Sequence, residues 1–168
     1  LILDDALECY EKGRKILILT GRVAHVEELG KKLKKKVPNV ICLTGGMGVK
    51  KTAQVMEKID VIADAEPFVL VATGSYIGEG FDEPRLDTLF LAMPIAWKGT
   101  LHQYAGRLHR LCNTKKDVQI YDYVDLHVRM LEKMYGKRLK GYASIGYKAK
   151  ATTFPDAPTN IIFTKDSF

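Results

Sequence analysis

The sequence predicts an α/β fold: a three-layer sandwich in which helices cover both faces of a mostly parallel central sheet. Apolar runs of strand length alternate with amphipathic helical segments along the chain. The first such run, Lys15–Thr20, reads Lys-Ile-Leu-Ile-Leu-Thr. A nearly continuous apolar strand is typical of a parallel sheet that is covered on both faces. Regular alternation of such strands with helices is the pattern of parallel strands joined by helical crossovers.

The elements are expected in a regular order along the chain. We expect helices at residues 4–12, 23–36, 50–63, 101–111 and 128–139, and strands at residues 15–20, 40–43, 68–72, 88–92 and 118–123. The second helix illustrates the pattern, because Val26, Leu29 and Leu33 recur at helical spacing. Residues 1–150 are therefore expected to form one domain. Residues 151–168 contain Pro155 and Pro158 and are expected to form an irregular tail or the start of a following segment.

Composition narrows the class of protein. A chain of 168 residues with 46% hydrophobic residues suits one globular core. It contains no bilayer-spanning apolar run and no secretory signal pattern. Its three cysteines are too few for a disulfide framework, so reduced thiols and a cytoplasmic location are expected. The first residue is leucine, which suggests a piece of a longer polypeptide. The net charge of +6 favours an anionic partner.

A basic segment with tyrosines leaves two interpretations open. Between residues 129 and 150 the bases are Lys133, Lys137, Arg138, Lys140, Lys148 and Lys150, interleaved with Tyr135, Tyr142 and Tyr147. Glu132 alone opposes them. Bases with aromatic residues can bind phosphates and stack on nucleobases. The alternative is a solvated basic face whose tyrosines pack on the core.

The most informative stretch is residues 69–110, where a glycine-rich loop after one strand is followed by a second strand and a helix. At about 100° per residue, one side of that helix is apolar: Leu101, Tyr104, Ala105, Leu108, Leu111 and Cys112. The opposite side carries Gln103, Gly106, Arg107 and Arg110. A glycine inside a helix costs about 1 kcal/mol relative to alanine, so its presence needs a reason. Close approach of a ligand to the backbone beside two arginines is such a reason, and arginine binds phosphate oxygens bidentately.

The usual phosphate-cradling and metal-binding motifs are absent. Residues 45–52 resemble a P-loop, but Lys50 stands where that motif needs glycine. Lys51 likewise breaks the dinucleotide-binding glycine spacing. His109 and Cys112 lack the further ligands that a zinc site needs, so no metal site is expected. The chain is therefore not expected to hold a nucleotide's terminal phosphates by itself.

With these residues in view, the chain resembles the second RecA-like domain of superfamily-2 helicases and translocases. Gln103-x-x-Gly106-Arg107-x-x-Arg110 matches motif VI of that family, and Thr73-Gly74 through Gly80-Phe81-Asp82 matches motif V. Thr20-Gly21-Arg22 corresponds to motif IV, and Thr44-Gly45-Gly46 to the loop after the next strand. The chain is most similar to the restriction-enzyme and phage types of DEAD/DEAH-like helicase. It departs from the DEAD-box pattern by one extra residue before Asp82 and by the absence of the His-Arg opening of motif VI.

The resemblance implies specific roles. Arg110 would be the catalytic arginine finger and Arg107 would assist it. The residues implied at the nucleotide are Gln103, Gly80, Asp82 and Gly106, and those implied at the nucleic acid are Thr20, Arg22, Thr44, Thr73 and Gly74. ATP and Mg²⁺ would be held mainly by a first RecA-like domain of the same polypeptide, so this chain alone is expected to be inactive. The resemblance thus implies a motor that acts on DNA in restriction or repair, with no membrane partner.

Two other functions fit the residues. The first is a nucleic-acid-binding or regulatory RecA-like module without ATPase activity. The second is a nucleotide-sugar-binding α/β enzyme domain that uses the same crevice at the carboxyl ends of the strands.

Overall fold

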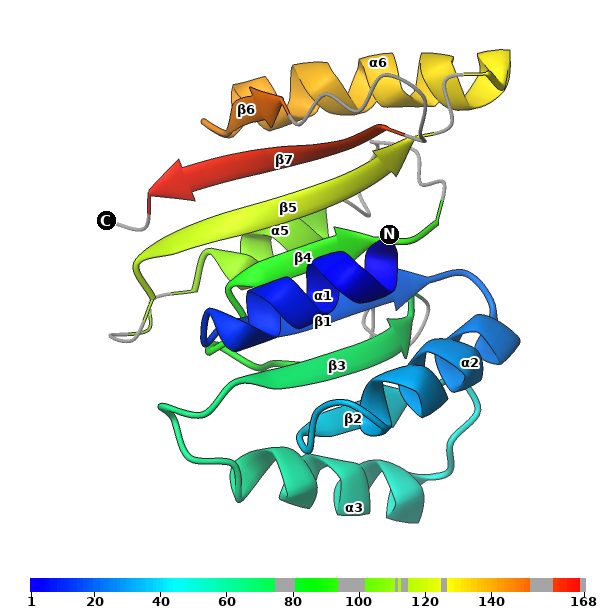
Figure 1. Ribbon diagram of the computed structural model, residues 1–168, viewed down its shortest axis with the longest axis vertical. Helices are drawn as coiled ribbons and strands as arrows, with labels where there is room; N and C mark the ends of the chain where they lie inside the picture. Colours follow the sequence, from blue (N-terminus) through cyan, green and yellow to red (C-terminus); the bar gives the residue numbers. More distant parts are fainter. Residues whose placement is uncertain are drawn as a thin grey trace.

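The computed structural model describes residues 1–74, 81–93, 102–110, 112, 115–124, 127–151 and 159–166 (Figure 1). The first seven elements are α1 (Ile2–Glu11), β1 (Lys15–Thr20), α2 (Val23–Lys34), β2 (Val40–Leu43), α3 (Val49–Asp60), β3 (Phe68–Thr73) and β4 (Thr88–Leu91). They are followed by α5 (His102–Leu108), β5 (Asp117–Val124), α6 (Arg129–Ser144), β6 (Lys148–Ala151) and β7 (Thr159–Asp166). None of the described helices is both long and apolar enough to cross a membrane.

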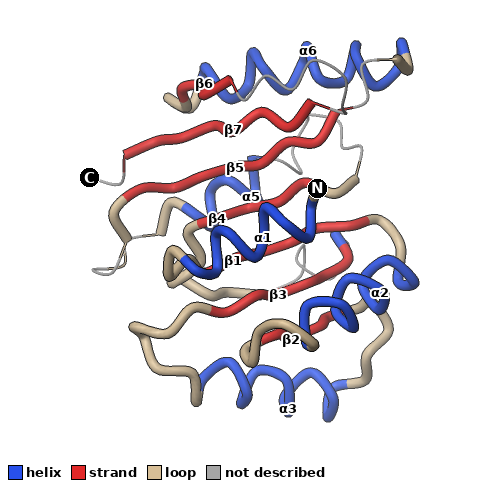
Figure 2. The backbone as a smooth tube through the Cα atoms, viewed as in Figure 1, coloured by secondary structure: helices blue, strands red, loops and turns tan. Residues whose placement is uncertain are grey.

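The strands form one seven-stranded sheet in the order β2-β3-β1-β4-β5-β7-β6. The pairs among β1 to β5 are parallel, and β7 is antiparallel to both β5 and β6. The predicted α/β fold with a mostly parallel sheet is therefore confirmed. Figure 2 shows the strands side by side, with helices on the sheet's faces.

Two hydrophobic cores lie on opposite faces of the sheet, because successive strand residues point to opposite sides. In β1, Ile16 and Ile18 pack with residues of α1 and α2. Leu17 and Leu19 pack with residues of α3, α5 and α6. The three cysteines are free, with Cys9 buried and Cys42 and Cys112 half-buried.

The expectation of an irregular tail is wrong for residues 159–166, which form β7. This strand pairs with the full length of β5, from Asp117 opposite Asp166 to Val124 opposite Thr159. The sequence from residue 159 to 164 is rich in β-branched and aromatic residues, which favour strands. Pro155 and Pro158 dominated the prediction, and both lie outside the described residues, ahead of this strand. The sheet therefore continues past the domain boundary expected at residue 150.

The stacking interpretation of the basic segment is wrong, because its tyrosines are in the core. Tyr135, Tyr142 and Tyr147 are buried, and Tyr142 stacks on Phe163 of β7 with ring centroids 4.0 Å apart. Burial raises the pKa of the Tyr135 hydroxyl to about 12. The alternative, a solvated basic face over packed tyrosines, is confirmed, although Arg138 is itself buried.

Candidate nucleotide and nucleic-acid site

The carboxyl ends of the parallel strands meet at one edge of the sheet. In register, Thr20 of β1 lies beside Thr73 of β3, Leu19 lies beside Leu91 of β4, and Leu43 of β2 lies beside Ala72. The loops after these strands therefore open at the same edge. Ligands of open parallel sheets bind in the crevice outside this edge.

The helix α5 presents its apolar side to the core. Tyr104, Ala105 and Leu108 are buried, as predicted, whereas Leu101 and Leu111 lie outside the described residues. Gly106 is exposed, and a Cβ atom built on it would meet no atom of the described residues within 4 Å. The backbone of α5 is therefore open to a ligand at this residue.

Arg110 follows the end of α5 and donates a hydrogen bond to the carboxylate of Asp82. The two side chains are solvent-accessible, with relative exposures of 56% for Arg110 and 45% for Asp82. An exposed ion pair of this kind contributes about 0–1 kcal/mol to stability. Arg110 is thus held in place beside Asp82 but is not locked into the core.

The loop that carries Asp82 is anchored on both sides of this residue. Phe81 is buried before it and Glu83 after it. Glu83 accepts hydrogen bonds from Nε and Nη2 of Arg85, both at 2.8 Å. Arg85 also donates to the carbonyl oxygens of Ile59 and Ile62 at the end of α3. Its guanidinium therefore joins the Asp82 loop to the preceding helix.

Lys115 anchors the backbone at Arg110, the second residue of the Asp82–Arg110 ion pair. Its ammonium group donates to the carbonyl oxygens of Leu108 (2.9 Å) and Arg110 (3.0 Å), which lie at the end of α5. Burial lowers the pKa of Lys115. The sequence contained no signal for this contact, because a bond to backbone oxygens depends on chain geometry rather than residue pattern.

Three further predicted site residues are described only in part or not at all. The backbones of Gln103 and Arg107 lie in α5, but the positions of their side chains are not among the described parts of the structure. Gly80 lies outside the described residues altogether.

Tyr104 links α5 to the loop after β3. Its hydroxyl donates a hydrogen bond to the carbonyl oxygen of Gly74 at 2.6 Å. A Cβ atom on Gly74 would lie 2.5 Å from Cε of Met93 and 3.0 Å from the Tyr104 hydroxyl. Gly74 is therefore closely packed, unlike Gly106.

The threonines at the edge use their hydroxyl groups internally. Thr20 is 1% exposed, and its Oγ1 lies 2.8 Å from Nδ1 of His25 in a hydrogen bond. Thr73 is 5% exposed, and its Oγ1 accepts a hydrogen bond from the backbone amide of Gly45 at 3.0 Å. The role of His25 could not be predicted from the sequence, since a lone histidine has no distinguishing pattern.

Arg22 and Thr44 are more accessible than these threonines. Arg22 is exposed at the N-cap position of α2 and lines a pocket of about 490 Å³ together with Thr20 and His25. Thr44 is half-buried and lines a pocket of about 530 Å³ with Lys50 and Lys51. The second pocket lies at the N-terminus of α3, where backbone amides and the helix dipole favour anions.

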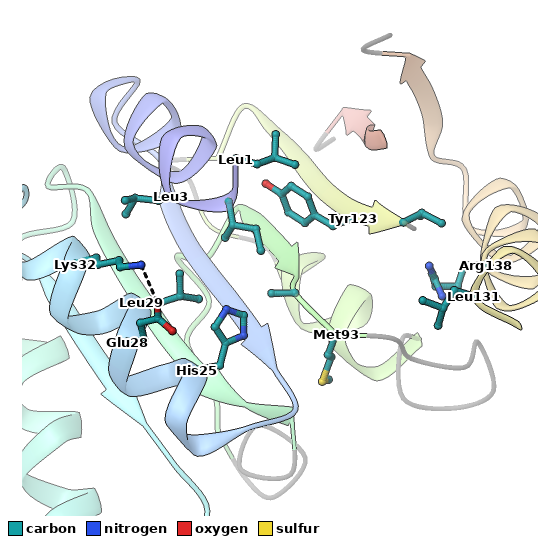
Figure 3. Close-up of a pocket in the computed structure, with 13 residues that line it drawn as sticks. Leu1, Leu3, His25, Glu28, Leu29, Lys32, Met93, Tyr123, Leu131 and Arg138 are labelled. Atoms are coloured by element: carbon teal, nitrogen blue, oxygen red, sulfur yellow. Dashed lines mark hydrogen bonds and ion pairs between the residues drawn. The ribbon is translucent and has the colours of Figure 1, made fainter. Parts of the chain in front are cut away.

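A further pocket of about 470 Å³ lies between α1, α2 and α6 (Figure 3). Its walls are mainly apolar, with His25 and Arg138 among the few polar side chains. His25 and Met93 line both this pocket and the one beside Arg22. None of the predicted site residues that the structure describes lines it. Within the described part of the chain, no group of three or more His, Cys, Asp and Glu side chains could hold a metal ion.

The sheet order and the helices on both faces of the sheet define a RecA-like α/β domain. Residues 1–112 match the model of the Helicase conserved C-terminal domain family. The chain belongs to this family, and the predicted resemblance is confirmed.

Known relatives and structures agree with this assignment. The chain is 32% identical over 142 residues to the putative helicase 161L of Invertebrate iridescent virus 6, covering 79% of this chain and 30% of that protein. It is 26% identical over 137 residues to the transcript termination protein A18 of Fowlpox virus, covering 80% of this chain and 29% of that protein. The crystal structure of T4 UvsW is similar with a TM-score of 0.67 and 18% identity, over 85% of this chain and 31% of that chain. The last likeness concerns the fold alone.

Proposed function

We propose that the chain is the second motor domain of an ATP-dependent DNA helicase or translocase, with Arg110 as its arginine finger. The observation that supports this most directly is the exposed pair of Arg110 with Asp82. It joins the residue expected to contact the γ-phosphate to the loop expected at the nucleotide. Because the chain spans less than a third of the two viral relatives described above, the activity belongs to a longer protein.

Arg110 exchanges one anion for another in this proposal. Without a partner domain, the Asp82 carboxylate balances its charge. A triphosphate held with Mg²⁺ by the first RecA-like domain offers oxygens that an arginine fork binds bidentately. The Arg110–Asp82 ion pair is exposed and contributes little to stability, so breaking it for the triphosphate costs little free energy. An arginine finger then stabilises the transition state of phosphoryl transfer by about 10³–10⁵ in rate.

Gly106 and Arg107 are the other residues of α5 that contact the nucleotide in this proposal. Gly106 leaves the α5 backbone open, so the triphosphate approaches the helix without a steric clash. Arg107 lies one residue further along the same helix and adds a second cation. This chain supplies neither a P-loop nor metal-binding acids in the proposal, and it is inactive when isolated.

The loops after β1 and β2 form the nucleic-acid grip in this proposal. Arg22 and the loop around Thr44 are the accessible groups, with Lys50 and Lys51 beside the α3 N-terminus. Thr20 and Thr73 shape the two loops from within, through His25 and the Gly45 amide. Phosphates dominate affinity in such contacts, so binding is salt-dependent.

The test is an arginine variant in the polypeptide that also contains the first RecA-like domain. Arg110→Ala is expected to lower kcat for ATP hydrolysis by about 10³-fold or more, with a much smaller effect on KM. Arg110→Lys is expected to recover only part of the rate, because lysine lacks the fork. Lys116→Ala, at an exposed lysine nearby, is the matched control. A rate for Arg110→Ala near that of the wild type rules out the finger role.

The alternatives predict different results. A regulatory module without ATPase activity would show no ATP hydrolysis even with the first domain present. A nucleotide-sugar-binding enzyme domain would bind its nucleotide as the isolated chain, which calorimetry detects.

A further inference from the structure

The helix α6 carries a row of four cations on one side. Arg129, Lys133, Lys137 and Lys140 are separated by four, four and three residues, and all are exposed. At about 100° per residue the four side chains fall within an arc of roughly 80°. With a rise of 1.5 Å per residue, the row is roughly 16 Å long. None of the four forms an ion pair with another described residue.

The opposite side of α6 is fixed to the core, which determines where the row faces. Arg138 is buried and donates from Nε and Nη2 to the Asp122 carboxylate at 2.7 and 3.0 Å. The hydroxyl of Tyr142 donates to the same carboxylate at 3.0 Å. Asp122 lies in β5, so α6 cannot rotate about its axis without breaking a buried ion pair. The row is therefore held toward solvent.

The row starts at the edge of the sheet where the parallel strands have their carboxyl ends. β5 ends at Val124 and α6 begins at Arg129, so Arg129 lies near the carboxyl ends of the parallel strands. In Figure 1 the N-terminal end of α6, drawn in yellow, lies on the same side as the arrowheads of β1, β3, β4 and β5. From there the helix runs back along the outside of the sheet.

We propose that this row binds the phosphodiester backbone of the nucleic acid that is held at the carboxyl edge. The inference rests on the proposed function and extends its nucleic-acid grip to a second surface. One strand of a duplex carries a phosphate about every 3.4 Å, so a row of this length faces about five phosphates. The tyrosines of the segment are buried, so the row contacts phosphates without stacking on bases. Contacts to phosphates alone are independent of sequence.

The packing of α6 argues against a membrane surface as the partner. A basic amphipathic helix binds lipid by burying its apolar side in the membrane. In α6 that side, with Tyr135 and Tyr142, is already packed against the protein core. The solvent-facing side of α6 is dominated by its charges, with Met130 and Leu139 as exposed apolar side chains, and the regular charges of a nucleic-acid backbone complement it.

The chain contains a matched control for net charge. The C-terminal end of α2 and the residues after it carry four exposed lysines that form no ion pair with any residue the structure describes: Lys31, Lys34, Lys35 and Lys36. Because α2 begins after β1 and runs back along the sheet, these lysines lie away from the carboxyl edge. Replacing either set with alanine removes the same charge from the chain.

The experiment measures binding of a labelled single-stranded oligothymidine by fluorescence anisotropy across a range of salt concentrations. The variant with alanine at all four positions of the α6 row is expected to bind at least about tenfold more weakly at low salt. The slope of log K against log salt should fall by about 2–3, at about 0.7 for each lost phosphate contact. The variant with alanine at the four α2 lysines should change the slope by less than about 1. Thermal unfolding checks that both variants remain folded.

Other outcomes overturn the inference in distinguishable ways. Equal losses in the two variants would mean that net charge alone attracts the oligonucleotide. Wild-type binding that is undetectable at low salt would also reject the row. Anionic phosphatidylserine vesicles that bind as tightly, with the same dependence on the row, would reassign it to lipid. None of these results affects the ATPase test of Arg110, so a failure here leaves the proposed function standing.

Discussion

Asp82 and Arg110 form an ion pair, so the loop before β4 is joined directly to the end of α5. Both residues are about half exposed, and each is anchored by a neighbouring contact: Phe81 is buried beside Asp82, and Lys115 bonds the Arg110 carbonyl oxygen. The pair is therefore well positioned although its own energy is small. Such a relationship suits a residue that must be placed accurately and then released to a ligand.

Asp82→Asn is expected to lower the rate of ATP hydrolysis while leaving the stability of the fold nearly unchanged. The free energy of unfolding should change by less than about 0.5 kcal/mol, because the pair is solvent-exposed. In the polypeptide with a first RecA-like domain, kcat should nevertheless fall by about 10–100-fold, because a misplaced catalytic group loses about that much. Denaturant unfolding and steady-state ATPase assays measure the two quantities.

The pairing itself can be tested by a double-mutant cycle. If Asp82 acts by placing Arg110, adding Asp82→Asn to Arg110→Ala should lower kcat little further. Fully additive losses would mean that Asp82 works independently of Arg110, and the positioning role would be abandoned.

Tyr104→Phe is expected to weaken the link between α5 and the loop after β3. The substitution removes the hydroxyl that bonds the Gly74 carbonyl oxygen, while the ring stays buried. We expect a loss of about 1–2 kcal/mol in the free energy of unfolding. Because Gly74 follows Thr73, stimulation of ATPase activity by nucleic acid should also fall, which a comparison of rates with and without DNA would show.

Tyr147→Phe is the matched control for that substitution. Tyr147 is also buried, but its hydroxyl has no hydrogen-bond partner in the described structure. Its removal should leave stability and DNA stimulation nearly unchanged. Equal effects of the two substitutions would show that the Tyr104 hydroxyl has no special role.

The parallel part of the fold could be predicted because its signal is local. Lys15–Thr20 and Phe68–Thr73 are buried along their whole length, so each strand is a continuous apolar run. The antiparallel strands could not be predicted in this way. β6 is short and alternates lysine with alanine, so its strand signal is weak. β7 contains β-branched and aromatic residues, but it follows two prolines, which dominated the prediction.

The site was only partly predictable for a related reason. The family resemblance picked out Asp82 and Arg110, but their pairing joins residues that are 28 positions apart in the chain. The contacts of Arg85 and Lys115 go to backbone carbonyl oxygens, which leave no trace in residue type. For Thr20, the family resemblance implied a nucleic-acid contact, and only the structure shows that its hydroxyl is also hydrogen-bonded to His25.

Gly106→Ala is expected to move stability and activity in opposite directions. A Cβ atom at this position meets no atom of the described part of the chain, and alanine favours a helix over glycine, so the free energy of unfolding should rise by up to about 1 kcal/mol. The same methyl group would obstruct the triphosphate, so we expect kcat/KM for ATP to fall at least about tenfold, the scale of 1.4 kcal/mol. Thermal unfolding and ATPase assays with the first domain present test both.

Gly136→Ala provides the comparison, because Gly136 also lies in a helix with no atom within 4 Å of its Cβ position. It should stabilise the chain similarly and leave ATP hydrolysis unchanged. If Gly106→Ala kept full activity, the open backbone of α5 would have no role in nucleotide binding.

Arg14→Met is expected to destabilise the chain in a pH-dependent way. Arg14 donates to Asp117 at 2.7 Å and pairs with Asp87 at 3.3 Å, at the amino-terminal edge of the sheet. Burial opposes ionisation of Asp117, but hydrogen bonds from Arg14 and Gln119 outweigh it and lower its pKa. Burial raises the pKa of Asp87, with Arg14 as the main opposing influence.

The signs follow from linkage. The lowered pKa of Asp117 contributes stability above its unfolded value near 3.8, and this is lost as the pH falls through the folded value. Without Arg14, this contribution shrinks and the pKa of Asp87 rises further, which favours the folded state only in acid. The stability deficit of Arg14→Met should therefore be about 2–3 kcal/mol near neutral pH, and it should narrow as the pH falls below about 4. Urea unfolding across this pH range measures it, with Lys116→Met as an exposed control. A deficit that is constant with pH would show that Arg14 acts by packing rather than through these two carboxylates.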